Sequence, residues 1–550
     1  MVVNRAVKAR DRGKKMRFAK TLGILAAAAA IVLSGATPAH AQAMEAVPAR
    51  GPGEGAGPYP LLVIRGATLV DGTGAPPLGP VDISISGNRI TAIDAAGTPG
   101  LPLSPDREPR GAALEIDATG MTVLPGFVDV HGHNGDPQKA PNATYGYKLW
   151  LAHGVTSVLG VPFYFGDPRG LVDAAQSADN RIVAPRLYPY AVIGDLWNGG
   201  AIDSPEQARK WVRWAKGQGY LGAKFFNSQS PAVMAAALDE LDKQGMGSVA
   251  HLGQGGVAKT NARQAGTMGL DAITHFYGHF ESLLKDRSLP AYPNDYNMLD
   301  EQDRFYIVSK LADQIHEPGS PEWNAYLQHQ LERGVIFNPT FEIYSASRDL
   351  MRAKNADWHD RYTPPSLWRF FQPSRDAHGS YWFDWTTEKE VSWKRFYRPY
   401  MQLMNDYKNM GGMVTVGSDP GYIYQTWGFS YILELEMLQE AGFSPLEVIK
   451  AATSNGAHQI FDPRGIEPPI GTVEVGKLAD LVIVPGNPLQ NLKLLYGTGF
   501  EKLDANNQVE RVGGVRWTIK DGIVYDAPKL LEDVAATVAA QKADQGLPAD

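Results

Sequence analysis

The chain has 550 residues, of which 44% are hydrophobic and 20% are charged. These are ordinary values for a globular protein that is large enough to bury a sizeable core. Its formal net charge of -7 gives no electrostatic footprint for nucleic acid, so we expect no nucleic-acid partner. The absence of cysteine excludes structural disulfides and a lipid-modified cysteine near the N-terminus.

Residues 1–41 have the pattern of a secretory signal peptide. A basic stretch precedes an apolar run at residues 22–33, and residues 39–41 (Ala-His-Ala) fit the small-x-small rule for cleavage. The apolar run is too short to span a bilayer comfortably, so cleavage before Gln42 is favoured over a lasting membrane anchor. Met16 is an alternative start that leaves a shorter signal. We therefore expect a periplasmic or secreted protein without a stable membrane anchor.

Two blocks of short strands lie far apart in the sequence. Residues 59–122 alternate apolar and polar positions, and residues 466–527 hold further strands with the hairpin signal Asp521-Gly522. Neither block has enough strand to close a sheet, so we expect both to form one small β-sandwich. Residues 42–58 are rich in Gly, Pro and Ala and predict a flexible lead-in, and residues 528–550 predict a C-terminal helix and tail.

The segment between these blocks, residues 123–465, alternates short apolar strands with helices. Ser204 and Pro205 begin one helix with a hydroxyl N-cap and a proline in the first turn, and Ser230 and Pro231 begin the next. The alternation continues over roughly three hundred residues and favours a parallel sheet, most economically a (β/α)8 TIM barrel. The predicted fold is therefore α/β, a TIM barrel with a small β-sandwich built from both ends of the chain.

Polar residues stand at the carboxyl ends of the predicted barrel strands, where the catalytic groups of such barrels lie. The candidate residues are His131, His133, Lys224, His251, His275 and Asp419. His131 and His133 are two positions apart on one strand, so both rings point to one face and can bind the same metal ion. The strand ends together predict a metal site.

Each of these residues also has a structural interpretation when it is taken alone. His251 or His275 can be an interior histidine with satisfied hydrogen bonds, and Asp419 precedes a proline, where turn and cap residues are common. Lys224 is typical of a snorkelling or salt-bridged lysine, since its ammonium repels a metal ion. It becomes a ligand only if CO2 adds to its neutral amine and forms a carbamate.

The order H-x-H, K, H, H and D, each at a strand end, resembles the amidohydrolase superfamily of the binuclear type. The resemblance covers roughly residues 61–525 and includes four further landmark segments. These segments are residues 62–72, 124–133, 451–457 and 476–484. The local sequence around Lys224 and the later histidine is similar to the branch that contains prolidase-like dipeptidases and imidazolonepropionase-like enzymes.

This resemblance implies two divalent metal ions bridged by an N6-carboxylysine at Lys224. One ion would be held by His131, His133 and Asp419, and the other by His251 and His275. Nitrogen and oxygen ligands without sulfur favour zinc. A metal-bridging hydroxide would attack the substrate, and Asp419 would serve as the proton shuttle, a role worth about 10²–10⁴-fold in rate.

The expected function is hydrolysis of an amide-type C–N bond in a small-molecule substrate: a peptide, an N-acyl amino acid or a cyclic amide. One alternative is a mononuclear imidazolone-hydrolase or deaminase-like enzyme, with Lys224 a bystander and His275 orienting the water. Esterase, lactonase or phosphotriesterase activity is also open, because a bridging hydroxide attacks any suitably placed electrophile. A noncatalytic periplasmic binding protein is least favoured. A homo-oligomer is possible.

Two departures from the family bear on the substrate. Residues 225–230 (Phe-Phe-Asn-Ser-Gln-Ser) replace the small, glycine-rich stretch of the prolidase-like peptidases, which argues against a dipeptide with a free carboxylate. An insertion at about residues 281–400 is rich in aromatic residues over 358–400. Because loops after barrel strands overhang the active site, one interpretation of this stretch is a lid or an aromatic wall for a bulky apolar or aryl acyl group. The other is an accessory helical subdomain or a subunit interface.

Four other residues receive weaker interpretations. Tyr277 and His279 follow His275 and are candidate pocket residues. His153 is interpreted as structural or as a support for a ligand, and Glu434 as a packing or capping residue on an outer helix.

Overall fold

The computed structural model describes residues 44–548 except 227–228, 257–258 and 376–378. The predicted signal peptide, with both candidate start residues, lies outside the described residues. In the described part of the chain, no helix is long and apolar enough to cross a membrane.

A parallel sheet of seven strands forms the barrel, in the order β12-β11-β10-β9-β8-β7-β6. The strands are β6 (Phe127–Gly132), β7 (Val155–Gly160), β8 (Arg186–Val192), β9 (Gly222–Phe226), β10 (Gly247–His251), β11 (Ala272–Thr274) and β12 (Ile336–Asn338). Residues 412–419, which end at Asp419, contribute only a bridge to the ladder, where Val414 pairs with Phe337. On its other edge, Val130 N donates to Val416 O at 2.9 Å. This segment therefore closes the barrel between β12 and β6 and confirms the predicted (β/α)8 fold.

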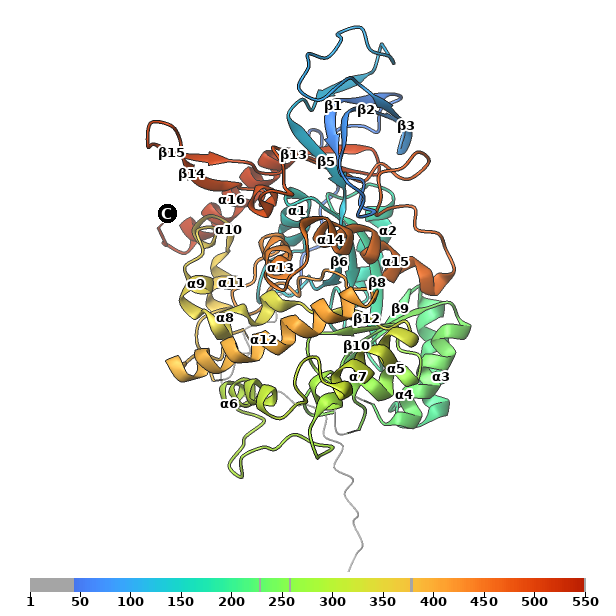
Figure 1. The fold of residues 1–550 in the computed structure, drawn as a ribbon, viewed down its shortest axis with the longest axis vertical. Coiled ribbons are helices and arrows are strands. Elements are labelled where there is room, and N and C mark those ends of the chain that lie inside the picture. The colour runs from blue at the N-terminus through green and yellow to red at the C-terminus, as the bar shows by residue number, and fades with distance from the viewer. Residues whose placement is uncertain (1–43, 227–228, 257–258, 376–378, 549–550) are drawn as a thin grey trace, which may run out of the picture. The chain divides into compact units, whose positions relative to one another are not determined.

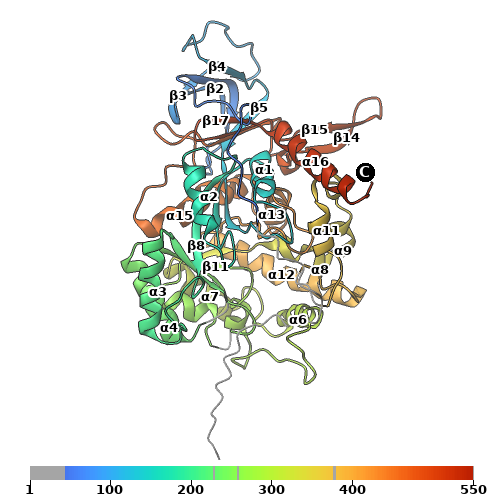
Figure 2. The ribbon, with the colours of Figure 1, turned by 180° about the vertical axis from the view of Figure 1, so that it is seen from behind.

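Helices pack outside the strands in the predicted alternation (Figures 1 and 2). They include α1 (Thr144–Ala152), α2 (Arg169–Ala178), α3 (Pro205–Gln218), α4 (Pro231–Lys243), α5 (Ala262–Thr267), α7 (Pro321–Glu332), α13 (Phe429–Glu440), α14 (Pro445–Lys450) and α15 (Gly456–Phe461). The Ser204 hydroxyl accepts from Gln207 N at 3.4 Å at the start of α3, as the N-cap pattern predicts. Gly219 ends α3 at φ 100°, a left-handed position that favours glycine.

A second, mixed sheet of eight strands takes its strands from both ends of the chain, as predicted. These strands are β1 (Leu62–Leu69), β2 (Leu78–Ser86), β3 (Arg89–Ala95), β4 (Leu114–Asp117), β5 (Met121–Pro125), β13 (Leu481–Pro485), β16 (Trp517–Lys520) and β17 (Ile523–Asp526). β5 pairs antiparallel with β13 and so joins the two ends. Asp521 and Gly522 have φ of 55° and 75°, the left-handed pair that a two-residue hairpin turn needs. Figure 1 shows this sheet beside one end of the barrel.

The structure differs from the predicted domain organisation near the N-terminal strands in two respects. β5 continues to Pro125, so the sheet extends past residue 122. Residues 44–58, expected to be a flexible lead-in, are bound to the body of the protein: Ala56 pairs with Val524, and Arg50 N donates to Arg181 O at 2.7 Å. A short hairpin, β14 (Phe500–Leu503) with β15 (Val509–Val512), stands apart from the sheet, and α16 (Ala527–Asp544) follows β17.

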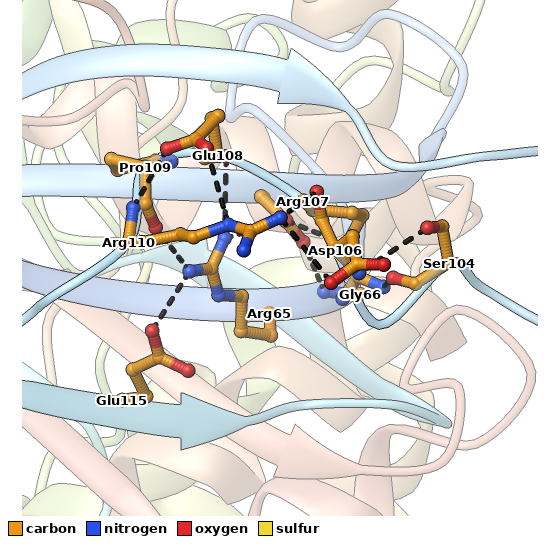
Figure 3. A network of polar contacts seen from close by, with 10 residues as sticks. Arg65, Gly66, Ser104, Asp106, Arg107, Glu108, Pro109, Arg110 and Glu115 are labelled. Atoms are coloured by element: carbon orange, nitrogen blue, oxygen red, sulfur yellow. Dashed lines mark hydrogen bonds and ion pairs between the residues drawn. The ribbon is translucent and has the colours of Figure 1, made fainter.

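A polar network that includes Arg65 and Arg107 (Figure 3) holds the loop before β4 against the second sheet, and the buried carboxylate of Asp82 lies at its centre. Asp82 is 2% exposed and accepts from Arg65 Nη1 at 3.0 Å, from Arg107 Nε at 2.8 Å and from Gly66 N at 2.8 Å. Burial raises the pKa of Asp82, but these donors outweigh it, so the pKa lies below its ordinary value. Arg65 also pairs with Glu115 at 2.8 Å. The network therefore ties β1 to β2 and β4.

The aromatic insertion is mainly helical. Its helices are α6 (Glu301–Val308), α7, α8 (Ser345–Arg348), α9 (Leu350–Lys354), α10 (His359–Tyr362), α11 (Pro365–Phe370) and α12 (Thr387–Asn409). The tyrosines of α12 anchor the loop after β12: the Tyr397 hydroxyl donates to Phe341 O at 2.5 Å, and the Tyr400 hydroxyl donates to Pro339 O. This face of α12 therefore packs against the loop after β12.

Candidate metal centre

The structure brings the six predicted ligands together at the carboxyl end of the barrel. Five of them line one cavity of about 360 Å³; these are His131, His133, His251, His275 and Asp419. The sixth, Lys224, is 1% exposed and lies in β9 at the same end. Residues separated by as many as 288 positions therefore meet because the parallel strands end at one rim.

Asp419 is the point on which three imidazoles converge. Its Oδ1 lies 3.2 Å from His133 Nε2 and 3.7 Å from His131 Nε2, and its Oδ2 lies 3.6 Å from His275 Nε2. The donor atoms of His131, His133 and Asp419 all lie within 4.8 Å of one another. The fourth imidazole, His251, has its ring 4.7 Å from that of His275. This spacing is compact enough for one ion to contact several donors.

Hydrogen bonds on the far side of two rings set their tautomers. His133 Nδ1 lies 2.8 Å from Pro162 O, which can only accept, so this nitrogen carries the proton. His275 Nδ1 lies 2.5 Å from Thr340 Oγ1, whose own proton goes to Pro339 O at 2.6 Å. Both rings therefore carry a proton on Nδ1, which leaves Nε2, the nitrogen that faces Asp419, as the atom that can bind a metal ion, as in metal-binding histidines.

Burial lowers the pKa values of His131, His275 and Lys224 and so favours the uncharged side chains, whose nitrogen lone pairs can bind a metal ion. Burial and the nearby Lys224 lower the pKa of His131 well below its ordinary value, and burial and His251 do the same for His275. Burial lowers the pKa of Lys224 to about 7, although Asp419 opposes this change. The Lys224 amine, which donates to Thr274 Oγ1 at 3.3 Å, is then substantially uncharged near neutral pH and available to react with CO2.

Asp129 is a supporting residue that the sequence analysis did not single out. Its Oδ1 accepts from His131 N and Ser418 N, both at 3.0 Å, and its Oδ2 accepts from Trp150 Nε1 at 3.0 Å and from the Ser418 hydroxyl. One carboxylate thus joins β6 to the closing segment beside Asp419. Asp129 has the same strand parity as His131 and His133, a signal that points it into the barrel.

The remaining cavity wall is largely aromatic. Phe226 and Tyr277 flank the His251 ring, with centroids 4.8 Å and 4.6 Å away. Other lining residues include Phe165, Met298, Glu301, Arg304, Phe305 and Tyr344. No described residue of the stretch 358–400 lines this cavity, so the interpretation of that stretch as an aromatic wall is wrong. Its rings lie behind the wall, where Trp393 stacks on Tyr344 at 5.6 Å.

Three of the weaker interpretations are also resolved by position. His279 does not line the cavity, since its ring is buried and its Nδ1 contacts the Tyr326 hydroxyl at 2.5 Å. His153 is structural, with Nδ1 bonded to Leu149 O at 2.8 Å. Glu434 lies on α13 and is fully buried, where it accepts from Glu342 N at 3.0 Å. Tyr277 is the one of the four that reaches the cavity.

The donor set fits divalent metal ions on the evidence of these side chains. The described site offers imidazole nitrogens, a carboxylate and a lysine amine whose pKa is about 7, and no thiolate, because the chain has no cysteine. Nitrogen and oxygen donors in this combination are those that zinc and related divalent ions prefer.

Known proteins show the same fold and a related sequence. An allantoinase of Rubrobacter xylanophilus is 29% identical over 195 residues, which are 35% of this chain and 38% of the allantoinase. The chain spans less than half the length of the curated relatives it matches. A Xaa-Pro dipeptidase structure has a TM-score of 0.54 at 20% identity and covers 85% of this chain and all of its own. Bottromycin amidohydrolase has a TM-score of 0.59 at 18% identity, covering 90% and 92%.

The two structural similarities, at these identities, concern the fold alone. The family assignment rests on a model of the amidohydrolase family, which matches residues 122–524 and so spans most of the chain. The protein belongs to the amidohydrolase family.

Proposed function

We propose that this protein is a metal-dependent hydrolase that cleaves an amide-type C–N bond in a small molecule. The observation that supports this most directly is the convergence of three Nε2 atoms on Asp419 beside a buried lysine whose pKa is about 7. As part of the proposal, the signal pattern of residues 1–41 places the activity in the periplasm or outside the cell.

In this proposal His131, His133 and Asp419 would hold one divalent ion, most simply zinc, and His251 and His275 would hold a second. Lys224, as N6-carboxylysine, would supply a ligand to this centre. Divalent ions in such a site lower the pKa of water to about 7 and polarise a carbonyl oxygen. A pKa of about 7 leaves a large fraction of the Lys224 amine uncharged and able to form the carbamate, which supports the binuclear arrangement.

Asp419 has the position that a proton carrier needs. Its side chain is 14% exposed and faces the cavity, whereas the imidazoles around it are nearly or fully buried. Water adds to the amide carbon and the C–N bond breaks, giving an amine and a carboxylic acid, which then loses its remaining proton to solvent and becomes a carboxylate. Asp419 takes the proton from water and returns it to the departing nitrogen, so that nitrogen leaves as a neutral amine.

Replacement of the proton carrier tests this assignment. For Asp419→Asn we expect turnover of amide substrates to fall by about 10²–10⁴-fold, because the amide oxygen can still contact metal but cannot carry a proton. Metal content is measured on the same sample, and Asp94→Asn, at an exposed position on β3, is the matched control. An Asp419→Asn protein that retains its metal and turns over at near the parental rate refutes the role of Asp419.

A further inference from the structure

The cavity beside the metal centre has an exposed apolar mouth. Phe165 is 52% exposed, and Phe226 and Met298 are each 42% exposed, yet all three line this cavity. Phe165 stacks on His133 with centroids 5.5 Å apart, and the two phenylalanine rings meet at 6.4 Å. Large apolar side chains left open at a concave site indicate a surface for an apolar ligand group. This surface adjoins the residues that would hold the metal.

One guanidinium faces the same cavity. Arg304 is the only arginine among the described lining residues, which include no lysine. It comes from α6, within the insertion at residues 281–400 (Figure 1). Its Nη2 donates to Glu301 Oε1 at 3.0 Å, and its guanidinium carbon lies 4.9 Å from the Phe305 ring centroid. These two contacts hold the side chain at the cavity wall.

The Arg304 guanidinium has donors to spare. Its Nε is buried and has no hydrogen-bond partner among the described residues. Glu301 uses one of the five N–H groups that a guanidinium offers. A buried charged donor without a partner is unfavourable, and a carboxylate satisfies two such donors at once in a forked pair. The Nε itself is shielded from the cavity, but the Arg304 side chain is 21% exposed and lines the cavity, so its remaining terminal N–H groups point to an anionic group on the ligand.

We propose that Arg304 binds the free carboxylate of an N-acyl amino acid whose bulky apolar acyl group packs on Phe165, Phe226 and Met298. This assignment rests on the proposed amide hydrolysis and names its substrate class. The scissile amide then lies between the two subsites, beside Asp419. The sequence argued against a dipeptide with a free carboxylate because residues 225–230 replace the glycine-rich stretch of the prolidase-like peptidases. Arg304 offers a partner for a carboxylate from a different segment.

Two non-hydrolysable probes measure this recognition without turnover. 3-Benzoylpropionate is the carbon isostere of hippurate (N-benzoylglycine), and butyrophenone has the same skeleton with a methyl group in place of the carboxylate. Calorimetric titration of the zinc-loaded enzyme gives the ratio of their dissociation constants. We expect the wild type to prefer the carboxylate by at least about tenfold, since a charge-assisted pair is worth that much or more.

Substitutions at Arg304, Arg287 and Glu301 test which side chain causes the preference for the carboxylate. Arg304→Gln should remove the preference for the carboxylate. Arg304→Lys keeps the positive charge but loses the paired donors of the guanidinium, so it should retain part of the preference. Arg304→Lys is the variant to use if Arg304→Gln does not fold. Arg287→Gln is the matched control at an exposed arginine of the same insertion and should keep the full preference. Glu301→Gln should also keep it.

Three results overturn the assignment of Arg304: a wild type without the preference, an Arg304→Gln protein that retains it, or a loss seen in Glu301→Gln instead. Hippurate hydrolysis, followed by glycine release, is measured separately and reports on the proposed function. A carboxylate preference that depends on Arg304 in an enzyme that does not cleave hippurate or related amides supports the subsite and counts against amide hydrolysis.

Discussion

Asp129→Asn is the substitution that most sharply tests how the barrel supports the metal centre. The native carboxylate accepts four hydrogen bonds, two on each oxygen, from His131 N, Ser418 N, Trp150 Nε1 and the Ser418 hydroxyl. Asparagine keeps one accepting oxygen. If that oxygen stays on the two backbone N–H groups, the new NH2 faces the indole N–H of Trp150, which cannot accept.

The expected loss of stability follows from the Trp150 N–H, which faces another donor in the Asp129→Asn protein. Trp150 is fully buried, so its N–H loses its partner without gaining water, and a buried donor left unpaired costs about 1–3 kcal/mol. With the weakened bonds at Ser418, we expect Asp129→Asn to lower the free energy of unfolding by about 2–4 kcal/mol. Because the backbone next to His131 and Asp419 also loosens, zinc affinity should fall by about 10–100-fold.

Urea unfolding followed by circular dichroism, and zinc competition with a chelator, measure the two effects. Trp150→Phe removes the donor itself, so a double-mutant cycle with Asp129→Asn should show a coupling energy of about 1–2 kcal/mol. An Asp129→Asn protein within about 0.5 kcal/mol of the wild type, with unchanged zinc affinity, would refute the idea that this carboxylate joins the first strand to the closing segment.

Two further predictions concern Lys224 and Asp271. Lys224→Ala should lose bound metal and activity, and small carboxylic acids such as acetate should restore part of both by replacing the carbamate; activity that survives without any added acid would favour the mononuclear alternative. Asp271 accepts from Ser248 N and from the Ser248 hydroxyl, each at 2.7 Å, and burial raises its pKa to about 6. The folded state therefore binds this proton more tightly than the unfolded state, and the resulting stability is present below about pH 4 and lost as pH rises through about 6. Relative to Asp271→Asn, the wild type should lose up to about 3 kcal/mol of unfolding free energy between pH 4 and pH 7; parallel stability curves would contradict this.

The strand-end residues could be predicted because local patterns mark both the strands and the helix starts between them. Ser204 caps α3, and Asp521 with Gly522 forms the predicted hairpin, since both features depend on neighbours within a few positions. His131 and Asp419 then follow from the rule that parallel barrel strands end at one rim.

The residues that the sequence did not reveal depend on distant contacts. Asp129 lies in the landmark segment 124–133, but its partner Ser418 lies 289 positions away, so the hydrogen bonds between them could not be predicted from local sequence. Arg304 lies in the insertion at residues 281–400, and its place in the cavity follows only from how α6 packs. The aromatic stretch 358–400 was predicted as a possible wall; composition alone does not distinguish rings that face a cavity from rings such as Trp393 that pack behind it.

The central claim is that Lys224 and its neighbours hold two metal ions. Metal content per chain is measured on protein beginning at Gln42, purified without chelator, before and after incubation with zinc and bicarbonate. The account predicts about two equivalents of divalent metal per chain, as in other two-metal hydrolytic sites. One equivalent would contradict the binuclear arrangement, and none after that incubation would contradict the metal centre itself.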